Sequence, residues 1–261
     1  MDPVEIQAFR DRIGIDRLTN GGAKDGVRAD WNDLPAAMPS YLRRLKLSRG
    51  EIIAIEPGLT EFDFDWSRDP EFLSVWVFVS GVGPQQAREK LVSLASQIMM
   101  MRIPYQAGPP HLGDLSVQHT GGRSTAIIWT FRNVCIHVDN NGTGVPVEPV
   151  ARAVQAFMKA NVVPDISVHL PKADNVVVSP KTITVGSQVQ VVVTLAKQTL
   201  PSDIVGRIRQ GREGLLEEQE VQSFSATYQA RQAGHSRINI SLVNRKTLLS
   251  PDLGIDIAVL P

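Results

Sequence analysis

Residues 72–160 carry the clearest alternation of hydrophobic and polar positions in the chain. Residues 73–79 (LSVWVFV) are rich in valine and aromatic side chains, as expected of a buried strand. Residues 84–98 follow with apolar side chains at helical spacing, beginning at Pro84, which suits the first position of a helix. The pattern then predicts strands over residues 114–118, 125–131 and 134–138 and a second helix over residues 146–159.

The connections between the last three of these strands are short. Arg132-Asn133 suits a two-residue hairpin turn, because asparagine tolerates a positive φ angle. The strands are therefore expected to pair in an antiparallel sheet, with the two helices covering one face. This arrangement is a two-layer α+β domain.

The first 60 residues are less periodic. Residues 4–13 predict a short helix, residues 39–47 a short helix or turn, and residues 51–56 (EIIAIE) a strand. We expect residues 1–60 to form an irregular first layer of the α+β domain, whose core spans residues 72–160.

The character of the chain changes at Pro164, after which short strand patterns replace the helical ones. An acidic run at residues 217–220 is expected to be a solvated loop or short helical turn. About 100 residues with regularly spaced turns fit one β-sandwich. We therefore divide the chain into an α+β domain, residues 1–163, and an all-β domain, residues 164–261. The seven predicted strands cover residues 176–178, 182–185, 189–195, 204–208, 224–228, 238–243 and 255–260.

Two stretches resemble known bacterial domains. Residues 174–261 resemble a bacterial immunoglobulin-like module through DNVVVSPKTITVGSQVQVVVTL, FSATYQARQAGHSRINISL and the closing GIDIAVL. Residues 72–160 resemble a poorly characterised α+β domain of exported bacterial proteins, through a loop ending in Leu112-Gly113-Asp114, the hairpin 131–134 and the helix 147–157. The resemblance implies an immunoglobulin-like sandwich after an α+β domain and an extracellular or cell-envelope location, and it implies no particular reaction.

Composition and charge argue against some partners and leave the cellular location open. Lys+Arg and Asp+Glu both number 27, and this balance argues against nucleic acid as a partner. The single cysteine, Cys135, excludes an intrachain disulfide, which leaves a cytoplasmic location open. No signal peptide is visible in this chain, although one removed before Met1 would leave no trace. No apolar run is long enough to predict a membrane-spanning helix.

Four residues are the candidates for a binding or acid/base site: His111, Asp114, His137 and Asp139. His111 and Asp114 share a loop, where the alternative is an exposed histidine beside an aspartate that caps a turn. Cys135, His137 and Asp139 alternate on one strand and share a face, which we expect to be the outer face of the sheet. Because metal sites need three or four convergent ligands, neither a metal nor another cofactor is predicted.

Acidic and aromatic residues also alternate over residues 62–69. Asp63, Asp65 and Asp69 faintly follow a calcium loop, but Arg68 and Ser74 stand where that motif requires glycine and an acidic residue, so a strand with outward acidic side chains is preferred. Trp66, Trp76 and Trp129 are expected either to pack in the core or to stack on sugar rings.

The sequence carries no convincing catalytic constellation. The leading hypothesis is therefore a non-catalytic binding or structural protein of the bacterial cell envelope or exterior, with the immunoglobulin-like module as spacer or interaction domain. Its partner would be another protein, a polysaccharide or further copies of itself. One alternative is a hydrolase with an acid/base or metal site near loop 108–114 and strand 134–139. Another is a self-assembling structural subunit of the cell surface.

Overall fold

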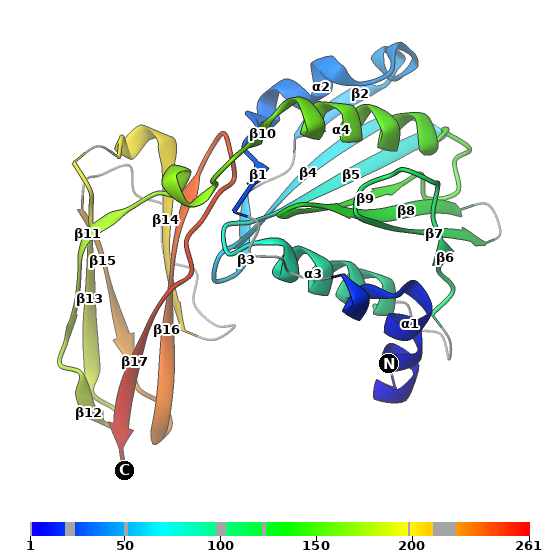
Figure 1. Cartoon of the computed structure of the whole chain (residues 1–261). Helices are drawn as coiled ribbons and strands as arrows, with labels where there is room; N and C mark the ends of the chain where they lie inside the picture. The colour runs from blue at the N-terminus through cyan, green and yellow to red at the C-terminus, as the bar shows by residue number, and fades with distance from the viewer. Residues whose placement is uncertain are drawn as a thin grey trace.

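An eight-stranded antiparallel sheet lies at the centre of the first half of the chain (Figure 1). The computed structural model describes residues 2–18, 24–49, 52–97, 103–121, 124–197, 199–210 and 223–261. Strand order in this sheet is β2-β4-β5-β9-β8-β7-β6, with β3 also paired to β4. Its strands are β2 (Lys46–Arg49), β3 (Ile53–Glu56), β4 (Leu59–Arg68), β5 (Glu71–Ser80), β6 (Gln106–Ala107), β7 (Leu115–Gly121), β8 (Ser124–Phe131) and β9 (Val134–Asp139).

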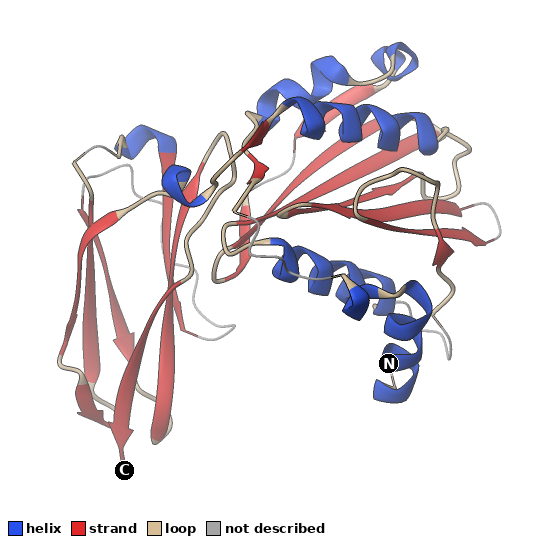
Figure 2. Ribbon diagram, in the orientation of Figure 1, coloured by secondary structure: helices blue, strands red, loops and turns tan. Residues whose placement is uncertain are grey.

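Helices cover both faces of this sheet, so the predicted two-layer arrangement is wrong: the first domain has three layers (Figures 1 and 2). Helices α1 (Pro3–Ile13) and α3 (Pro84–Ser96) pack on one face, and α2 (Leu34–Ala37) and α4 (Glu148–Ala160) on the other. The central strands are apolar on both sides: Val77 and Ile136 face α4, whereas Phe78 and Cys135 face α3. A strand whose side chains are apolar on both faces of the sheet is stable in water only when other elements pack on both faces.

Residues 1–60 do not form one irregular layer, which corrects a second expectation. Helix α1, at residues 4–13 as predicted, packs against α3. The 3-10 helices η1 (Ile15–Arg17), η2 (Trp31–Asp33) and η3 (Ser40–Arg44) follow, and β2 and β3 join the edge of the central sheet. The segment therefore contributes to all three layers: α1 belongs to the layer of α3, α2 to the layer of α4, and β2 and β3 to the sheet.

The predicted hairpin at residues 131–134 is present, but its positive φ angle falls on Arg132, at 54°, and not on Asn133. The Arg132 backbone N–H donates to Asp114 Oδ2 at 2.7 Å, and its guanidinium pairs with Asp25 at 3.1 Å. Asn133 is instead fully buried and bonds to two distant backbone segments. Tertiary bonds therefore decide which of the two residues adopts the left-handed conformation.

All seven strands predicted after Pro164 are present, in two sheets that share one apolar core. One sheet has the order β11-β13-β15 and the other β12-β17-β16-β14; β12 and β17 are parallel and the remaining pairs antiparallel. Residues 217–220 lie outside the described residues. The strands are β11 (Ala173–Ser179), β12 (Thr182–Thr184), β13 (Gln188–Leu195), β14 (Ile204–Gln210), β15 (Ser223–Gln229), β16 (Gly234–Asn244) and β17 (Leu253–Leu260).

The two halves meet through the loop between β16 and β17. Leu248 and Leu249 of this loop are fully buried in the apolar cluster beneath α4. The Trp31 indole donates to the Thr247 carbonyl at 3.2 Å. A Cβ added to Gly81 would lie 1.9 Å from the Ser250 carbonyl oxygen, so the two backbones approach as closely as glycine allows. The second half thus completes the core of the first.

Three of the remaining short elements lie where the two halves join, and the fourth, η5, lies within the second half. Strands β1 (Gly26–Val27) and β10 (Val162–Val163) form a two-stranded ribbon, η4 (Ser167–His169) follows it, and η5 (Pro201–Asp203) precedes β14. The eight-stranded sheet is formed by residues before Pro164, and the two sheets of the second half are formed by residues after it. The division of the chain into two domains at this residue stays a prediction. No helix among the described residues is long and apolar enough to cross a membrane.

Candidate functional site

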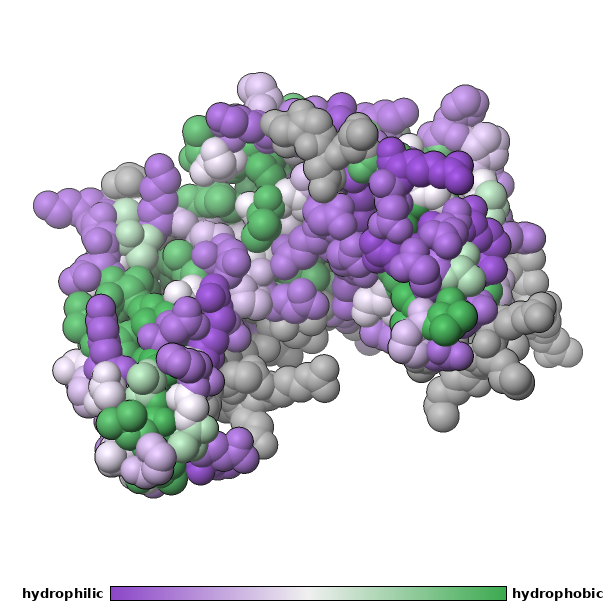
Figure 3. Space-filling model, turned by 60° about the horizontal axis from the view of Figure 1, so that its bottom comes forward, coloured by the Kyte–Doolittle hydropathy of each residue, from purple (hydrophilic) through white to green (hydrophobic). Residues whose placement is uncertain are grey.

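Polar and aromatic side chains cross strands β4, β5 and β9 on the side of the sheet that faces α3. Since side chains alternate along a strand, Asp63 and Asp65 of β4 point to this side, whereas Phe62 and Phe64 point into the cluster beneath α4. Figure 3, in which the α3 side comes forward, shows that the surface of the first half of the chain is mostly hydrophilic from this direction. The acid–aromatic strip, as we name it, consists of Asp63, Asp65, Ser74, Trp76, His137 and Asp139.

The strand register brings the members of the strip into two adjacent rows. Trp76 stands between Asp63 on β4 and His137 on β9. In the next row Ser74 stands between Asp65 and Asp139. The strip is therefore assembled from the β4–β5 hairpin and from β9, which lies more than 50 residues further along the chain.

Helix α3 covers only the neighbouring part of this face. It packs Ala87 and Leu91 into one apolar cluster with Phe78 and Cys135. In the strip itself, all members except the buried Ser74 are partly exposed. The strip is therefore a polar surface of the sheet, and it lies beside an apolar surface that α3 covers.

Asp63 has the most perturbed carboxyl group of the strip. Burial, reinforced by the neighbouring charges of Glu61 and Asp65, raises the pKa of Asp63 to about 7. Burial also raises the pKa of Glu61, against the attraction of the Lys90 ammonium. Asp65, by contrast, accepts a hydrogen bond of 2.5 Å from the Ser74 hydroxyl. The two aspartates of β4 thus occupy different electrostatic environments.

His137 forms an aromatic pair with Trp76, with ring centroids 4.5 Å apart. Burial lowers the pKa of His137 to about 4, in spite of the attraction of Asp139, so the imidazole is neutral near pH 7. Its Nε2 atom is buried, with no hydrogen-bond partner among the described residues. The pair therefore offers an uncharged aromatic surface beside the carboxylates.

Cys135, His137 and Asp139 share a face as expected, but that face is not the outer one. Cys135 is fully buried beneath α3, and burial raises the pKa of its thiol well above the usual range. A buried thiol with a raised pKa is a poor nucleophile. Among the described residues, no three His, Cys, Asp or Glu side chains converge to hold a metal ion.

The four candidate residues of the sequence analysis occupy two separate places. Asp114 caps the β8–β9 turn through the Arg132 N–H, and His111 is exposed with φ 61°. His137 lies five residues along β9 from that turn, roughly 16 Å away for an extended strand. The structure therefore brings His137 and Asp139 to the strip and leaves His111 and Asp114 outside it; a binding role for any of the four stays a prediction.

Sequence reasoning left Asp63, Asp65 and Trp76 out of the candidate site. The alternation of acidic and aromatic residues predicted a strand, and β4 is that strand. Its acidic side chains were expected to point outward, but they are only partly exposed on the sheet, and Asp63 is half-buried. Asp69 lies beyond the strand and is exposed. Trp66 and Trp129 are buried in the core, whereas Trp76 is partly buried and packs against the edge of the apolar cluster beneath α3.

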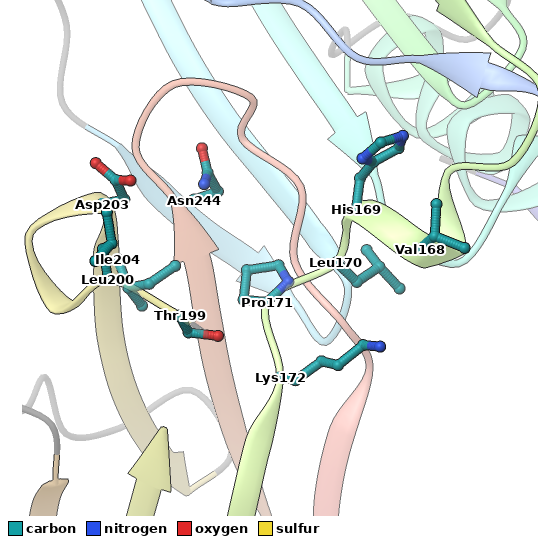
Figure 4. Close-up of a pocket in the computed structure, with 10 residues that line it drawn as sticks. All are labelled: Val168, His169, Leu170, Pro171, Lys172, Thr199, Leu200, Asp203, Ile204 and Asn244. Atoms are coloured by element: carbon teal, nitrogen blue, oxygen red, sulfur yellow. The ribbon is translucent and has the colours of Figure 1, made fainter. Parts of the chain in front are cut away.

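A pocket lies between η4 and the sheet of β14 and β16 (Figure 4). This cavity of about 270 Å³ has an apolar wall that includes Pro171 and Ile204, and Lys172 and Asp203 lie at separate points of its rim. No charged pair converges on its centre in Figure 4. The acid–aromatic strip therefore carries the more specific chemistry of the two.

Comparison with known proteins leaves the family of this chain open. No protein-family model and no curated protein matches its sequence. A polysaccharide lyase structure matches with 8% identity and a TM-score of 0.27, over 80% of this chain and 35% of the lyase. A Corynebacterium diphtheriae protein described as membrane anchored matches with 11% identity and a TM-score of 0.28, over 83% of this chain and 43% of that protein. The chain thus spans less than half of either protein, and TM-scores this low carry no argument about function.

Replacing Asp63 with asparagine is expected to stabilise the protein above neutral pH. The unfolded carboxyl ionises near pH 4 and the folded one at about 7, so the folded state loses stability as the pH rises through that window. Because the side chain is only half-buried, we expect a gain for Asp63→Asn of about 1 kcal/mol at pH 8 and almost none at pH 4. Urea unfolding of both proteins from pH 4 to pH 8 measures this; a difference independent of pH would contradict the raised pKa.

Proposed function

We propose that this chain is a non-catalytic polysaccharide-binding protein of the bacterial cell envelope or exterior. Residues 1–163 would bind a neutral polysaccharide on the acid–aromatic strip. Residues 164–261 would form an immunoglobulin-like spacer that presents the first domain. The observation that carries this proposal is the partly exposed Trp76–His137 ring pair, with Asp63 beside it in the same row and Asp65 and Asp139 in the adjacent row of the sheet.

The chemistry of the strip favours an uncharged, hydroxyl-rich ligand. Aromatic rings present apolar faces with a polar edge, and carboxylate oxygens accept hydrogen bonds from hydroxyl groups. The carboxylates of Asp65 and Asp139 would repel an anionic polymer. A neutral polysaccharide meets both conditions, since its rings have apolar faces and its edges carry hydroxyl donors.

The strand order of the second half supports the immunoglobulin-like part of the proposal. The sheets β11-β13-β15 and β14-β16-β17 follow the A-B-E and C-F-G orders of that fold. The buried loop at Leu248 and Leu249 joins this sandwich tightly to the first domain. A rigid junction suits a spacer, because it sets the direction in which the strip points. The envelope location rests on the sequence resemblance alone.

Replacing Trp76 with alanine is expected to weaken polysaccharide binding at least tenfold, because the ring supplies the apolar contact area of the strip. Affinity gel electrophoresis with an unsubstituted glucan and with polygalacturonate measures this. Wild-type protein should be retarded by the glucan and not by the polyanion. Tyr41→Ala, on the opposite side of the sheet near Pro146, is the matched control and should bind as wild type. Equal retardation of wild type and Trp76→Ala would contradict the proposal.

One observation favours hydrolysis at the same strip as a second candidate. Asp63 and Asp65 lie two residues apart on one strand face, and their carboxyl groups are close enough for the Asp65 charge to raise the pKa of Asp63. Glycosidases likewise use a pair of neighbouring carboxyl groups. Asp63 holds its proton near neutral pH, as a general acid does. An assay for reducing ends released from the glucan tests this candidate. Release by the wild type that is abolished in Asp63→Asn would favour a hydrolase over a non-catalytic binding protein. The hydrolase site was expected near loop 108–114 and strand 134–139; this candidate keeps His137 and Asp139 of that strand and replaces the loop with β4.

A further inference from the structure

The pocket between η4 and the sheet of β14 and β16 lies where the chain passes from the first half into the second (Figure 4). One wall is the linker that runs from η4 to β11, and the other contains η5 and the start of β14. Its volume of about 270 Å³ is just below the range of about 300–1,000 Å³ that holds drug-sized ligands. The pocket therefore has room for a ligand somewhat smaller than a typical drug molecule.

Apolar side chains line the inside of the pocket and continue onto its rim. Pro171 and Ile204 are buried, and Figure 4 shows Pro171 near the centre of the labelled residues. Val168 is 64% exposed and Leu200 is 62% exposed, so both present apolar surface to solvent at the same concavity. Because the burial of apolar surface is favourable, a ligand with an apolar body would be stabilised by contact with these side chains.

Two opposite charges lie at the two ends of the pocket. Figure 4 shows the Asp203 carboxylate and the Lys172 ammonium group at opposite ends of the labelled residues, with Pro171 between them. Neither charge forms an ion pair with another residue that the structure describes. Lys172 is exposed and Asp203 is partly exposed, so both can meet charges on a ligand. The separation of the two charges favours a ligand that is charged at both ends.

The Asn244 side chain adds a hydrogen-bond donor of fixed orientation. Its Oδ1 atom accepts hydrogen bonds from the Lys246 N–H at 3.0 Å and from the Thr247 N–H at 2.9 Å. These two bonds fix the amide plane and leave the Nδ2 group to donate to a ligand. Asn244 lines the pocket together with the Thr199 hydroxyl group. An amide carbonyl is the ordinary acceptor for such donors, which favours a ligand that contains peptide groups.

We propose that this pocket binds a short zwitterionic peptide of two or three apolar residues. Its terminal ammonium group would lie at Asp203, its carboxylate at Lys172, and a backbone carbonyl at the Asn244 amide. Its side chains would cover Val168 and Leu200. A single amino acid carries both charges on one carbon atom, whereas the pocket holds its own charges apart. The proposal does not depend on the acid–aromatic strip or on polysaccharide binding.

The open position of the two charges sets the strength of binding. Ion pairs between solvent-exposed groups contribute little, because water screens them. A dipeptide also has few atoms to contribute contacts. We therefore expect a dissociation constant on the order of 1 mM.

A titration of the whole ¹⁵N-labelled chain with the dipeptide Leu-Leu, followed by NMR, tests the proposal. The amide signals of Leu170, Asp203 and their neighbours should shift and approach saturation at about 10 mM dipeptide. N-acetyl-Leu-Leu-amide has the same apolar body without the terminal charges. It should bind the wild-type chain about tenfold more weakly, because both ion pairs are lost.

Variants at the two ends separate the contributions of the charges. Asp203→Asn and Lys172→Met should each raise the dissociation constant for Leu-Leu about threefold, and the double variant about tenfold. Lys181→Met removes an exposed lysine outside the pocket, and this matched control should bind as wild type. Trp76→Ala should also bind Leu-Leu as wild type, so a failure of polysaccharide binding and a failure of peptide binding are distinct results.

Three outcomes would overturn the proposal. The first is a wild-type spectrum that does not change at about 10 mM Leu-Leu. The second is equal affinity for Leu-Leu and for the blocked peptide, which would show that the terminal charges are not recognised. The third is a folded double variant, as judged by its own spectrum, that binds Leu-Leu as tightly as the wild type does.

Discussion

Replacing Leu249 with alanine is expected to lower the free energy of unfolding of the whole chain by about 3 kcal/mol. Leu249 is fully buried in the cluster beneath α4, although its loop belongs to the second half of the chain. Truncation leaves a cavity that the surrounding core fills only in part, and it loosens the junction between the halves. Urea unfolding followed by tryptophan fluorescence and by far-UV circular dichroism measures the change.

Leu200→Ala is the matched control, since Leu200 is 62% exposed and should change the stability by less than about 0.5 kcal/mol. In the wild type the two probes should report one coincident transition, because the second half supplies Leu248 and Leu249 to the core of the first. Two separated wild-type transitions, or an unchanged midpoint in Leu249→Ala, would show that the loop does not couple the halves.

Replacing Asn133 with alanine is expected to cost about 3 kcal/mol, because two buried backbone groups lose their partner. The Asn133 side chain accepts a hydrogen bond from the Val27 N–H at 2.7 Å and donates one to the Ser80 carbonyl at 2.9 Å. Its side chain thus joins the β8–β9 turn to β1 and to the end of β5. Urea unfolding measures the loss, and Asn175→Ala, at an exposed position of β11, should be nearly neutral.

Asn133→Asp refines this test. An ionised carboxylate still accepts from the Val27 N–H but faces the Ser80 carbonyl oxygen without a proton to share. The loss of stability should therefore be larger at pH 8 than at pH 4.5, where protonation restores a donor. A loss that does not change with pH would assign the effect of the alanine variant to packing and not to the two hydrogen bonds.

The second half of the chain was the more predictable one from sequence. Its strands bury one side only, so residues 189–195 carry buried apolar side chains at every second position, with Val192 as the one apolar residue between them. Short turns separate β11, β12 and β13. In the first half, strands such as β5 and β9 are buried on both sides. Their continuous apolar runs identify strands but do not say how many helical layers cover them, which is why two layers were expected where three are present.

The candidate site was predictable only in part, because it depends on strand register. His137 and Asp139 were selected from their own strand, and the structure places both in the strip. Asp63 and Trp76 reach them only through the pairing of β4 with β5 and of β5 with β9. The half-burial that raises the pKa of Asp63 arises from the folded sheet, so no local pattern reports it.

The sequence by itself determined the elements, the change of character at Pro164 and the balance of charge, since these depend on periodicity and composition over short windows. The tertiary structure alone decided the second helical layer, the assembly of the acid–aromatic strip and the insertion of Leu248 and Leu249 into the first domain. Each of these depends on contacts between residues far apart in the chain, and such contacts leave no period in the sequence.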